Sequence, residues 1–314
     1  MKVAVLKGGA SMERTVSLRS GARVEDALAR LGHDVLPIDV GPDLVDRLTA
    51  ERPDVAFVAL HGRGGEDGTV QELLELVGIP YTASRPGACI RCMDKVVAKH
   101  ALRDAGIPTP DFYAFNQTAF EDLGAARALP AIEERLEFPI VVKPAGQGSA
   151  LGIKFARTAA DVPNALVAAF SYDTKVILER FVDGRDLAVS VLDSADGPEA
   201  LPVVEAIPDT EDFYDFEARY VIGATRFVCP ADLPPEVTLR AQELALATWK
   251  VLGCSGFARV DLMLAGDELT VLEANAIPGL TDTSLLPLAA EAAGIGFDDF
   301  VARVLDLAVA RAPA

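Results

Sequence analysis

Two short segments near the C-terminal end predict a β-hairpin. They are Phe257-Ala-Arg-Val-Asp-Leu-Met-Leu264 and Leu269-Thr-Val-Leu-Glu-Ala-Asn-Ala276, joined by Ala265-Gly-Asp-Glu268. Side chains alternate between the two faces of a strand, so each segment divides into an apolar face and a polar face. The apolar face is expected to belong to a core.

The polar face of this hairpin carries two carboxylates. If the hairpin is symmetric about its turn, Asp261 lies opposite Glu273, and Arg259 lies opposite Asn275. Carboxylates placed directly across a ladder repel each other, which indicates that a cation is held there. Oxygen ligands without His or Cys select a hard ion such as Mg²⁺. The alternative is a solvated polar face on a two-sided sheet.

Composition bounds the class of protein. The 314 residues suffice for two or three compact domains. A formal net charge of −18 argues against binding to nucleic acid or to an anionic membrane, because both attract basic surfaces. The chain enters a strand at Lys2 without a leader, and no apolar run approaches membrane-spanning length, so a cytoplasmic location is expected. The four cysteines form no disulfide pattern and are expected to be free thiols, mostly in the core.

The order of strand and helix signals predicts three units. Signals alternate through residues 1–87, which is typical of an α/β unit with a parallel sheet. Residues 88–184 and 185–314 predict two further α+β units. Ligands of parallel sheets bind beyond the carboxyl ends of the strands, where the loops Gly8–Ser17 and His61–Gly68 are expected.

The sequence also predicts two helices, one strand and one lid. Helices are expected over Ser20–Leu31 and Cys89–Ala105, and a strand over Ile79–Thr82. Residues 209–235 form a long irregular stretch, and loops of this length are usually functional lids or flexible. We expect a lid there.

Three motifs occur in a fixed order along the chain. They are Leu6-Lys-Gly-Gly-Ala-Ser-Met-Glu-Arg-Thr-Val-Ser-Leu18, His61-Gly-Arg-Gly-Gly-Glu-Asp-Gly68 and Asn275-Ala-Ile-Pro-Gly-Leu-Thr-Asp-Thr-Ser284. Together they closely resemble the D-alanine:D-alanine ligases of bacterial cell-wall synthesis, and the likeness runs nearly end to end. The resemblance implies an ATP-grasp fold, in which two α+β domains clamp ATP behind an N-terminal parallel-sheet domain.

The resemblance also implies a reaction and its setting. ATP would convert the carboxylate of one D-alanine to an acyl phosphate, which the amine of a second D-alanine attacks. ATP and D-alanine are then the small-molecule partners of a cytoplasmic homodimer that serves peptidoglycan synthesis.

The resemblance implies a nucleotide site between the two grasp domains. Lys95 and Lys143 would contact phosphates, and Ser149 lies in a loop of small residues whose backbone N–H groups can cradle phosphate oxygens. The alternative for Lys95 is an exposed lysine on a helix. The other nucleotide residues implied are Glu179, Arg180, Phe181, Val182, Asp186, Phe213, Arg219 and Asn275.

Metal and substrate residues are implied in the same way. Asp261, Glu273 and Asn275 match the ligands of two Mg²⁺ ions, with Glu273 bridging them and Mn²⁺ as a substitute. Arg259 and the N–H of Gly279 would stabilise the oxyanion, and the alternative for Arg259 is an ion pair within the hairpin. The remaining substrate residues implied are Glu13, which anchors the first ammonium, His61, Tyr220 on the lid, Ser284 and Leu285.

The chain departs from the family pattern at three positions. Ala150 stands where a second serine is usual, Asp186 where Glu is usual, and Arg219 where Lys is usual. A D-alanine:D-serine or D-alanine:D-lactate ligase is one alternative. A nucleotide-binding protein that has lost catalysis is another, and only Ala150 and Arg219 favour it.

Overall fold

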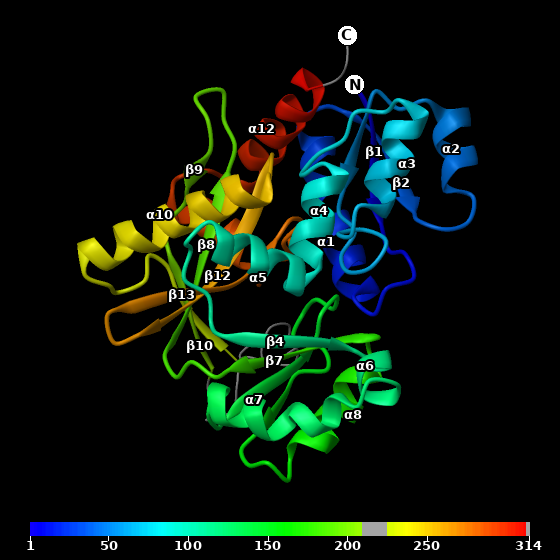
Figure 1. The fold of residues 1–314 in the computed structure, drawn as a ribbon. Coiled ribbons are helices and arrows are strands. Elements are labelled where there is room, and N and C mark those ends of the chain that lie inside the picture. The colour runs from blue at the N-terminus through cyan, green and yellow to red at the C-terminus, as the bar shows by residue number, and fades with distance from the viewer. Residues whose placement is uncertain (209–224, 312–314) are drawn as a thin grey trace.

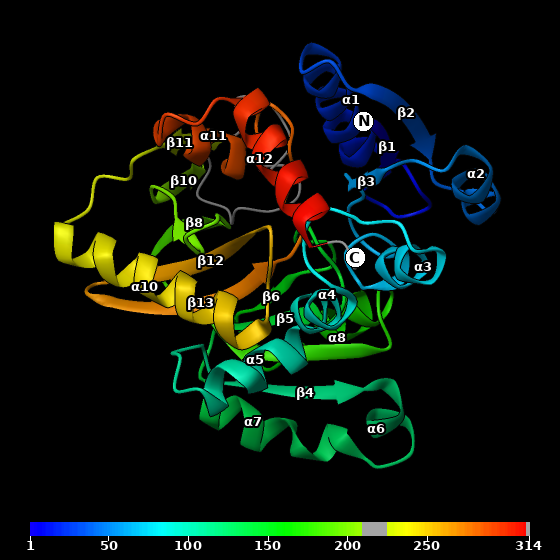
Figure 2. The same cartoon turned by 90° about the horizontal axis from the view of Figure 1, so that it is seen from above.

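The structure is a computed structural model that describes residues 1–208 and 225–311. These residues contain three β-sheets (Figure 1). The blue N-terminal sheet and the large C-terminal sheet lie in one half of the molecule, and the green central sheet lies below them. The view from above shows α12 (Phe297–Ala310) between the C-terminal sheet and the N-terminal helices (Figure 2).

The N-terminal sheet is parallel, as the alternating signals predict. Its elements are β1 (Lys2–Lys7), α1 (Arg14–Arg30), β2 (Asp34–Asp39), α2 (Leu44–Glu51), β3 (Val55–Val58) and α3 (Thr69–Val77). Strand β1 lies between β2 and β3, with Val3 beside both Val35 and Val55. Every residue of β3 is buried, as expected for an apolar strand covered on both faces.

The central sheet is antiparallel, in the order β4-β7-β5-β6. Its elements are β4 (Phe112–Asn116), α6 (Gln117–Glu121), η1 (Ala125–Ala128), α7 (Leu129–Leu136), β5 (Ile140–Pro144), β6 (Lys154–Ala156), α8 (Val162–Phe170) and β7 (Lys175–Arg180). Leu136 of α7 and Leu166 of α8 share one buried cluster with Val142 of β5. This sheet therefore has a core of its own.

The C-terminal sheet is antiparallel, in the order β11-β10-β8-β12-β13, with β9 beside β8. Its elements are β8 (Arg185–Leu192), β9 (Glu199–Ala200), β10 (Val204–Pro208), β11 (Thr225–Val228), α10 (Pro235–Leu252), β12 (Phe257–Ala265), β13 (Glu268–Asn275), α11 (Leu285–Ala292) and α12. Helix α10 packs against β8, β12 and β13.

The N-terminal and C-terminal sheets share a continuous apolar core. Phe57 of β3, Phe257 of β12 and Phe300 of α12 belong to it and are fully buried. Helices α4 (Pro86–Met93) and α5 (Lys95–Asp104) connect the N-terminal sheet to the central one, and both pack against α10 and β13. The boundaries at residues 87 and 184 stay predictions, and the shared core ties the two outer units together.

The helix expected over Cys89–Ala105 is two helices, so that prediction was wrong. The chain leaves helical geometry at Asp94, whose carboxylate accepts the backbone N–H groups of Val96 and Val97 at 2.9 and 3.2 Å. An Asp side chain can satisfy the first N–H groups of a new helix, which starts α5 inside a continuous apolar pattern. As a result Lys95 begins a helix instead of lying in the middle of one.

Helix α1 starts earlier than the expected Ser20. Ser17 and Ser20 interrupt the apolar pattern of the sequence, yet both are fully buried. The Ser17 hydroxyl donates to the carbonyl of Ala59 at 2.8 Å and accepts the N–H of Gly8 at 2.9 Å. Buried serines with such partners fit a core, which is why the polar signal placed the start too late.

The expected strand over Ile79–Thr82 and the expected irregular stretch over 209–235 both differ in the structure. Residues Ile79–Thr82 make only an isolated bridge, between Tyr81 and Ala56. The Thr82 hydroxyl takes the N–H of Val58 at 3.0 Å, so a side chain replaces the next ladder bond. Within the stretch expected to be irregular, residues 225–228 form β11, paired with β10. Residues 209–224 lie outside the described residues.

The four cysteines are free thiols, and three of them are buried, as expected. None of the helices in the described part of the chain has the length and apolar content needed to cross a membrane.

Replacing Asp94 with Ala should lower the free energy of unfolding by about 1 kcal/mol through loss of the α5 cap. Asp94 also pairs with Lys175 at 2.6 Å, so Lys175→Met is the control that removes the ion pair and keeps the cap. Urea unfolding of both variants separates the two effects. Equal destabilisation by the two substitutions would contradict a capping role.

Candidate active site

The hairpin of β12 and β13 has the predicted register. Arg259 pairs with Asn275, and Asp261 pairs directly with Glu273. A bulge follows Asp261, after which Leu262 pairs with Val271. The two carboxylates therefore face each other on the polar side of the sheet, and the bulge shifts only the end of the hairpin near its turn.

Arg259 neutralises Asp261 in a bidentate ion pair, with N–O distances of 2.6 and 2.8 Å. The side-chain amide of Asn275 also donates to Asp261, at 3.2 Å. Bidentate guanidinium–carboxylate pairs are among the stronger polar contacts in proteins. The ion pair considered for Arg259 is thus present, and it holds Asp261 in a fixed orientation.

Lys95 neutralises Glu273 from another element. Its ammonium lies 3.1 Å from the Glu273 carboxylate and donates to the carbonyl of Gln147 at 2.6 Å. Lys95 is buried, so the alternative of an exposed helix lysine was wrong. Through this one side chain, α5 connects the C-terminal hairpin to the loop that follows β5.

A second buried charge cluster lies in the central sheet. Glu179 of β7 is bound by Lys143 of β5 and by Lys99 of α5, each at 2.7 Å. Burial alone would raise the pKa of Glu179, but the two ammonium groups beside it hold that pKa below its ordinary value. Burial lowers the pKa of Lys99 to about 8. Sequence reasoning missed Lys99, although its position four residues after Lys95 on one helix face was a usable signal.

Glu13 and Ser149 join the N-terminal unit to the central one. The Ser149 hydroxyl donates to the Glu13 carboxylate, and both side chains are buried. A Cβ atom at Gly62 or Gly148 would lie 2.6 or 2.8 Å from a Glu13 oxygen, so glycine is required for this close approach. Burial, followed by the nearby Glu66 carboxylate, raises the pKa of Glu13.

Open space adjoins these groups. A cavity of about 390 Å³ is lined by Ser11, Glu13, Arg63, Gln147 and Leu151, among others. A much smaller one, about 10 Å³, touches Lys95, Gly148, Glu273 and Asn275. Residues from all three units thus surround one region of the molecule.

The loop after β13 carries the other predicted substrate residues. The Ser284 hydroxyl accepts the backbone N–H of Thr281 at 3.0 Å and lies 2.8 Å from the Thr281 hydroxyl. A Cβ at Gly279 would lie 2.8 Å from the Ser284 oxygen, so the loop passes close to that hydroxyl. Leu285 is buried in the shared core.

Family models match most of the chain. One described as D-ala D-ala ligase N-terminus matches residues 43–84, and one described as D-ala D-ala ligase C-terminus matches residues 101–306. The D-alanine–D-alanine ligase of Moorella thermoacetica is 44% identical over 310 residues, which cover 98% of this chain and 99% of that protein. That of Geobacter sulfurreducens is 42% identical over 97% of this chain and 93% of its own length.

This chain belongs to the D-alanine–D-alanine ligase family. The solved D-alanine–D-alanine ligase of Bacillus anthracis in complex with ATP superimposes with a TM-score of 0.83 at 32% identity, covering 99% of this chain and 98% of its own. The D-Ala:D-Ser ligase of Enterococcus faecalis also has a TM-score of 0.83, at 29% identity, covering 98% of this chain and 99% of its own. The fold is therefore the ATP-grasp fold with an N-terminal parallel-sheet domain, as expected.

His61 serves the framework of this family site. Its Nε2 lies 2.9 Å from the Ser20 hydroxyl, and its Nδ1 lies 3.1 Å from the carbonyl of Ile277 and 3.3 Å from Glu66. The carbonyl of Ile277 can only accept, so a hydrogen bond there requires a proton on Nδ1. Both ring nitrogens thus have partners within the protein.

Four further predicted nucleotide residues lie in or next to β7 and β8. The guanidinium of Arg180 donates to the carbonyl of Arg135 at 3.0 Å, because it points to the opposite face of β7 from Glu179. Phe181 packs edge-on against Phe155, with ring centroids 5.7 Å apart. Val182 follows β7, Asp186 lies in β8, and Phe213, Arg219 and Tyr220 lie outside the described residues.

The hairpin donors fit a hard divalent cation. Asp261, Glu273 and Asn275 offer oxygen atoms from two paired strands, and Asn275 uses its N–H on Asp261, which leaves its amide oxygen for a ligand. In the part of the chain that the structure describes, no three His, Cys, Asp or Glu side chains converge as a metal centre. The predicted ligands contain only two such side chains, Asp261 and Glu273, because the third ligand, Asn275, is an amide.

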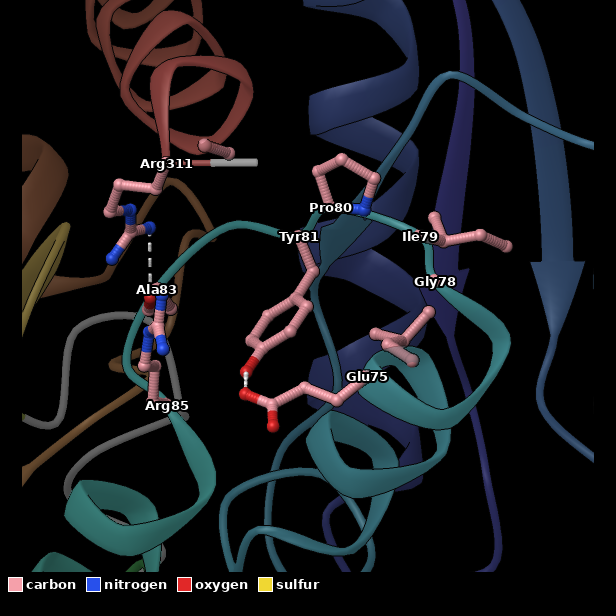
Figure 3. Close-up of a pocket in the computed structure, with 10 residues that line it drawn as sticks. Glu75, Gly78, Ile79, Pro80, Tyr81, Ala83, Arg85 and Arg311 are labelled. Carbon is pink, nitrogen blue, oxygen red and sulfur yellow. Dashed lines mark hydrogen bonds between the residues drawn. The ribbon is translucent and has the colours of Figure 1, made fainter. Parts of the chain in front are cut away.

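Another cavity lies away from this site. It has a volume of about 330 Å³ and lies between the end of α3, residues 78–85 and the end of α12 (Figure 3). Tyr81 donates to Glu75 at 2.8 Å, and Arg311 donates to the carbonyl of Ala83 at 3.1 Å. The residues that line it include none of the predicted site, and its volume is smaller than that of the cavity of about 390 Å³ beside Glu13.

Replacing Glu179 with Gln should lower the free energy of unfolding near pH 7 by about 3–5 kcal/mol, because two ammonium groups are left buried without a carboxylate. A base whose pKa is lower in the folded state than in the unfolded state binds fewer protons when folded. Stability therefore rises with pH between the two pKa values. Lys99 already has a pKa of about 8, below its ordinary 10.5, and the substitution lowers it further. The loss should therefore shrink between about pH 7 and pH 9.

Urea unfolding of the parent protein and of Glu179→Gln at about pH 7 and pH 9 measures this loss of stability. Glu51→Gln, which removes an exposed pair with Lys2, is the control and should change little at either pH. A Glu179→Gln variant as stable as the parent near pH 7 would show that the cluster is not a neutralised unit.

Proposed function

We propose that this chain joins two molecules of D-alanine to D-alanyl-D-alanine, using ATP and passing through an acyl phosphate, for peptidoglycan synthesis. Family membership over nearly the full length supports this reaction. The observation that carries it is the convergence of one hydrogen bond and two ion pairs from three units: Ser149 with Glu13, Lys95 with Glu273, and Arg259 with Asp261.

Glu13 is proposed to bind the ammonium of the first D-alanine. Its carboxylate lines the cavity of about 390 Å³, and burial raises its pKa. A nearby positive charge favours the ionised form of a buried acid, so an ammonium gains more from Glu13 than a neutral group would. Ser149 holds the carboxylate in place by its hydrogen bond.

Lys95 and Lys143 are proposed to bind phosphate oxygens of ATP. Both are buried and directed at carboxylates from neighbouring elements, which fixes their ammonium groups. Lys99 keeps Glu179 ionised, so Glu179 presents acceptor oxygens to the nucleotide. Mg²⁺ held by Asp261, Glu273 and Asn275 would neutralise phosphate charge, and Mn²⁺ is a proposed substitute.

Arg259 and the backbone N–H of Gly279 are proposed to stabilise the oxyanion formed when the second amine attacks. Donors fixed in advance at the point where negative charge develops lower the barrier most. Asp261 fixes the Arg259 guanidinium through two hydrogen bonds. Ser284 is proposed to receive the carboxylate of the second D-alanine. The lid residues Tyr220, Arg219 and Phe213 keep the roles implied by the resemblance.

The second substrate is the main alternative. A D-Ala:D-Ser ligase is among the structural relatives, so D-serine is a specific competitor for D-alanine. The deciding experiment measures phosphate release from ATP with D-alanine alone and then with D-serine or D-lactate added, with products identified by mass. Release with D-alanine alone and a D-alanyl-D-alanine product is expected. D-alanyl-D-lactate as the main product near neutral pH would refute the proposal.

The cellular location and the oligomeric state are also proposals. Because the reaction consumes ATP, we propose that the enzyme works in the cytoplasm. We also predict that it forms a homodimer. The solution mass of the purified protein tests the oligomeric state.

Glu273→Gln should abolish turnover in Mg²⁺ while the fold remains intact, because the variant loses one of the two facing carboxylates. Steady-state phosphate release and thermal unfolding measure the two effects. Glu268→Gln, at the exposed end of the same strand, is the matched control and should retain normal activity. Near-normal turnover of Glu273→Gln at ordinary Mg²⁺ would show that the Asp261–Glu273 pair is structural.

A further inference from the structure

Hydrogen bonds from helix α1 hold the loop of residues 277–284. One nitrogen of Arg23 in α1 (Nη1) donates to the carbonyls of Leu280 and Thr281, at 3.1 and 3.0 Å. The Arg23 guanidinium also lies over the ring of Phe297, 3.9 Å from its centroid. Its pair with Asp282 at 3.1 Å involves a carboxylate that is 91% exposed, so that pair contributes little.

The same face of α1 makes a second attachment. Ser20, one turn before Arg23, accepts the backbone N–H of Leu280 at 3.1 Å. His61 bonds both to this serine and to the carbonyl of Ile277. The loop is thus fixed at its start by His61 and at its centre by α1.

Peptide geometry links Arg23 to Ser284. The carbonyl of Leu280 and the N–H of Thr281 belong to one peptide unit and point in opposite directions. When Arg23 holds that carbonyl, the N–H is directed away from α1, and it donates to the Ser284 hydroxyl at 3.0 Å. The orientation of one peptide plane therefore places the Ser284 hydroxyl.

We propose that Arg23 is a positioning residue for the second substrate, acting through the Leu280–Thr281 peptide on Ser284. This rests on the proposed function, in which Ser284 receives the carboxylate of the second amino acid. In this proposal Arg23 acts through the loop and not by direct contact with substrate or ATP. Its loss lets the peptide plane rotate and weakens binding at the second substrate position, while the first position, at Glu13, lies on another loop.

If Arg23 served only to attach α1 to the C-terminal unit, a different result would be expected. Arg30 lies on the same helix and pairs with Asp298 of α12 at 2.6 and 2.8 Å, so it attaches α1 to the C-terminal unit without contacting the loop. If Arg23 only attached α1, Arg30→Met would have the same effect as Arg23→Met. Arg30→Met is therefore the matched control.

The experiment compares the KM for the second D-alanine, the KM for the first, the KM for ATP, kcat and Tm in the two variants. Arg23→Met is expected to raise the second KM about fivefold or more, the equivalent of one net hydrogen bond. The other two KM values should stay within about twofold, as expected for a contact that does not reach those sites. Arg30→Met should change none of the three, and Arg23→Lys, which keeps a cationic nitrogen that can donate, should recover part of the loss.

Hydrogen exchange over residues 277–284 gives a readout that does not depend on turnover. Faster exchange of this loop in Arg23→Met than in Arg30→Met is expected. Unchanged exchange, or a rise of all three KM values alike, would overturn the role of Arg23. A wild-type protein that forms no dipeptide would instead refute the proposed function, and the exchange data would still decide whether Arg23 orders the loop.

Discussion

The facing carboxylates of Asp261 and Glu273 set the requirement on which the site depends. Two anions across one ladder are stable only if cations reach both of them. Arg259 supplies one from the same strand, and Lys95 supplies the other from α5. Lys95 begins that helix because the chain restarts at Asp94, so the helix break, the packing of α5 on β13 and the neutral hairpin form one structural solution.

Sequence reasoning succeeded where the governing interactions are local. Alternation along β12 and β13 predicts the pairing of Asp261 with Glu273 without knowledge of the rest of the chain. The bulge after Asp261 escaped prediction because backbone pairing sets it. The start of α1 was misplaced because Ser17 and Ser20 find buried partners far away in the sequence. The Lys99–Glu179 pair joins residues 80 positions apart, so helical spacing could place Lys99 on the face of Lys95 but could not identify Glu179 as its partner.

Family likeness and physical contacts answer different questions about the same residue. Likeness gave His61 a substrate role, which stays a prediction, and in this structure its two ring nitrogens contact Ile277 and Ser20. Likeness included Arg180 in the nucleotide set, which also stays a prediction, and strand alternation directs its guanidinium to the opposite face from Glu179. Likeness thus predicts a role, and the side-chain contacts show which protein groups hold the residue in place.

The charges of the site are already paired within the protein, and this shapes how ligands must enter. A phosphate that binds Lys95 competes with Glu273, and a cation that binds Asp261 competes with Arg259. Either ligand alone would leave one protein charge without its partner in a region of low dielectric, which is unfavourable. A phosphate chain and its cations entering together replace both partners at once. If Lys95 binds phosphate and Asp261 binds a cation, as proposed, pairing within the site favours the metal-bound nucleotide over either component alone.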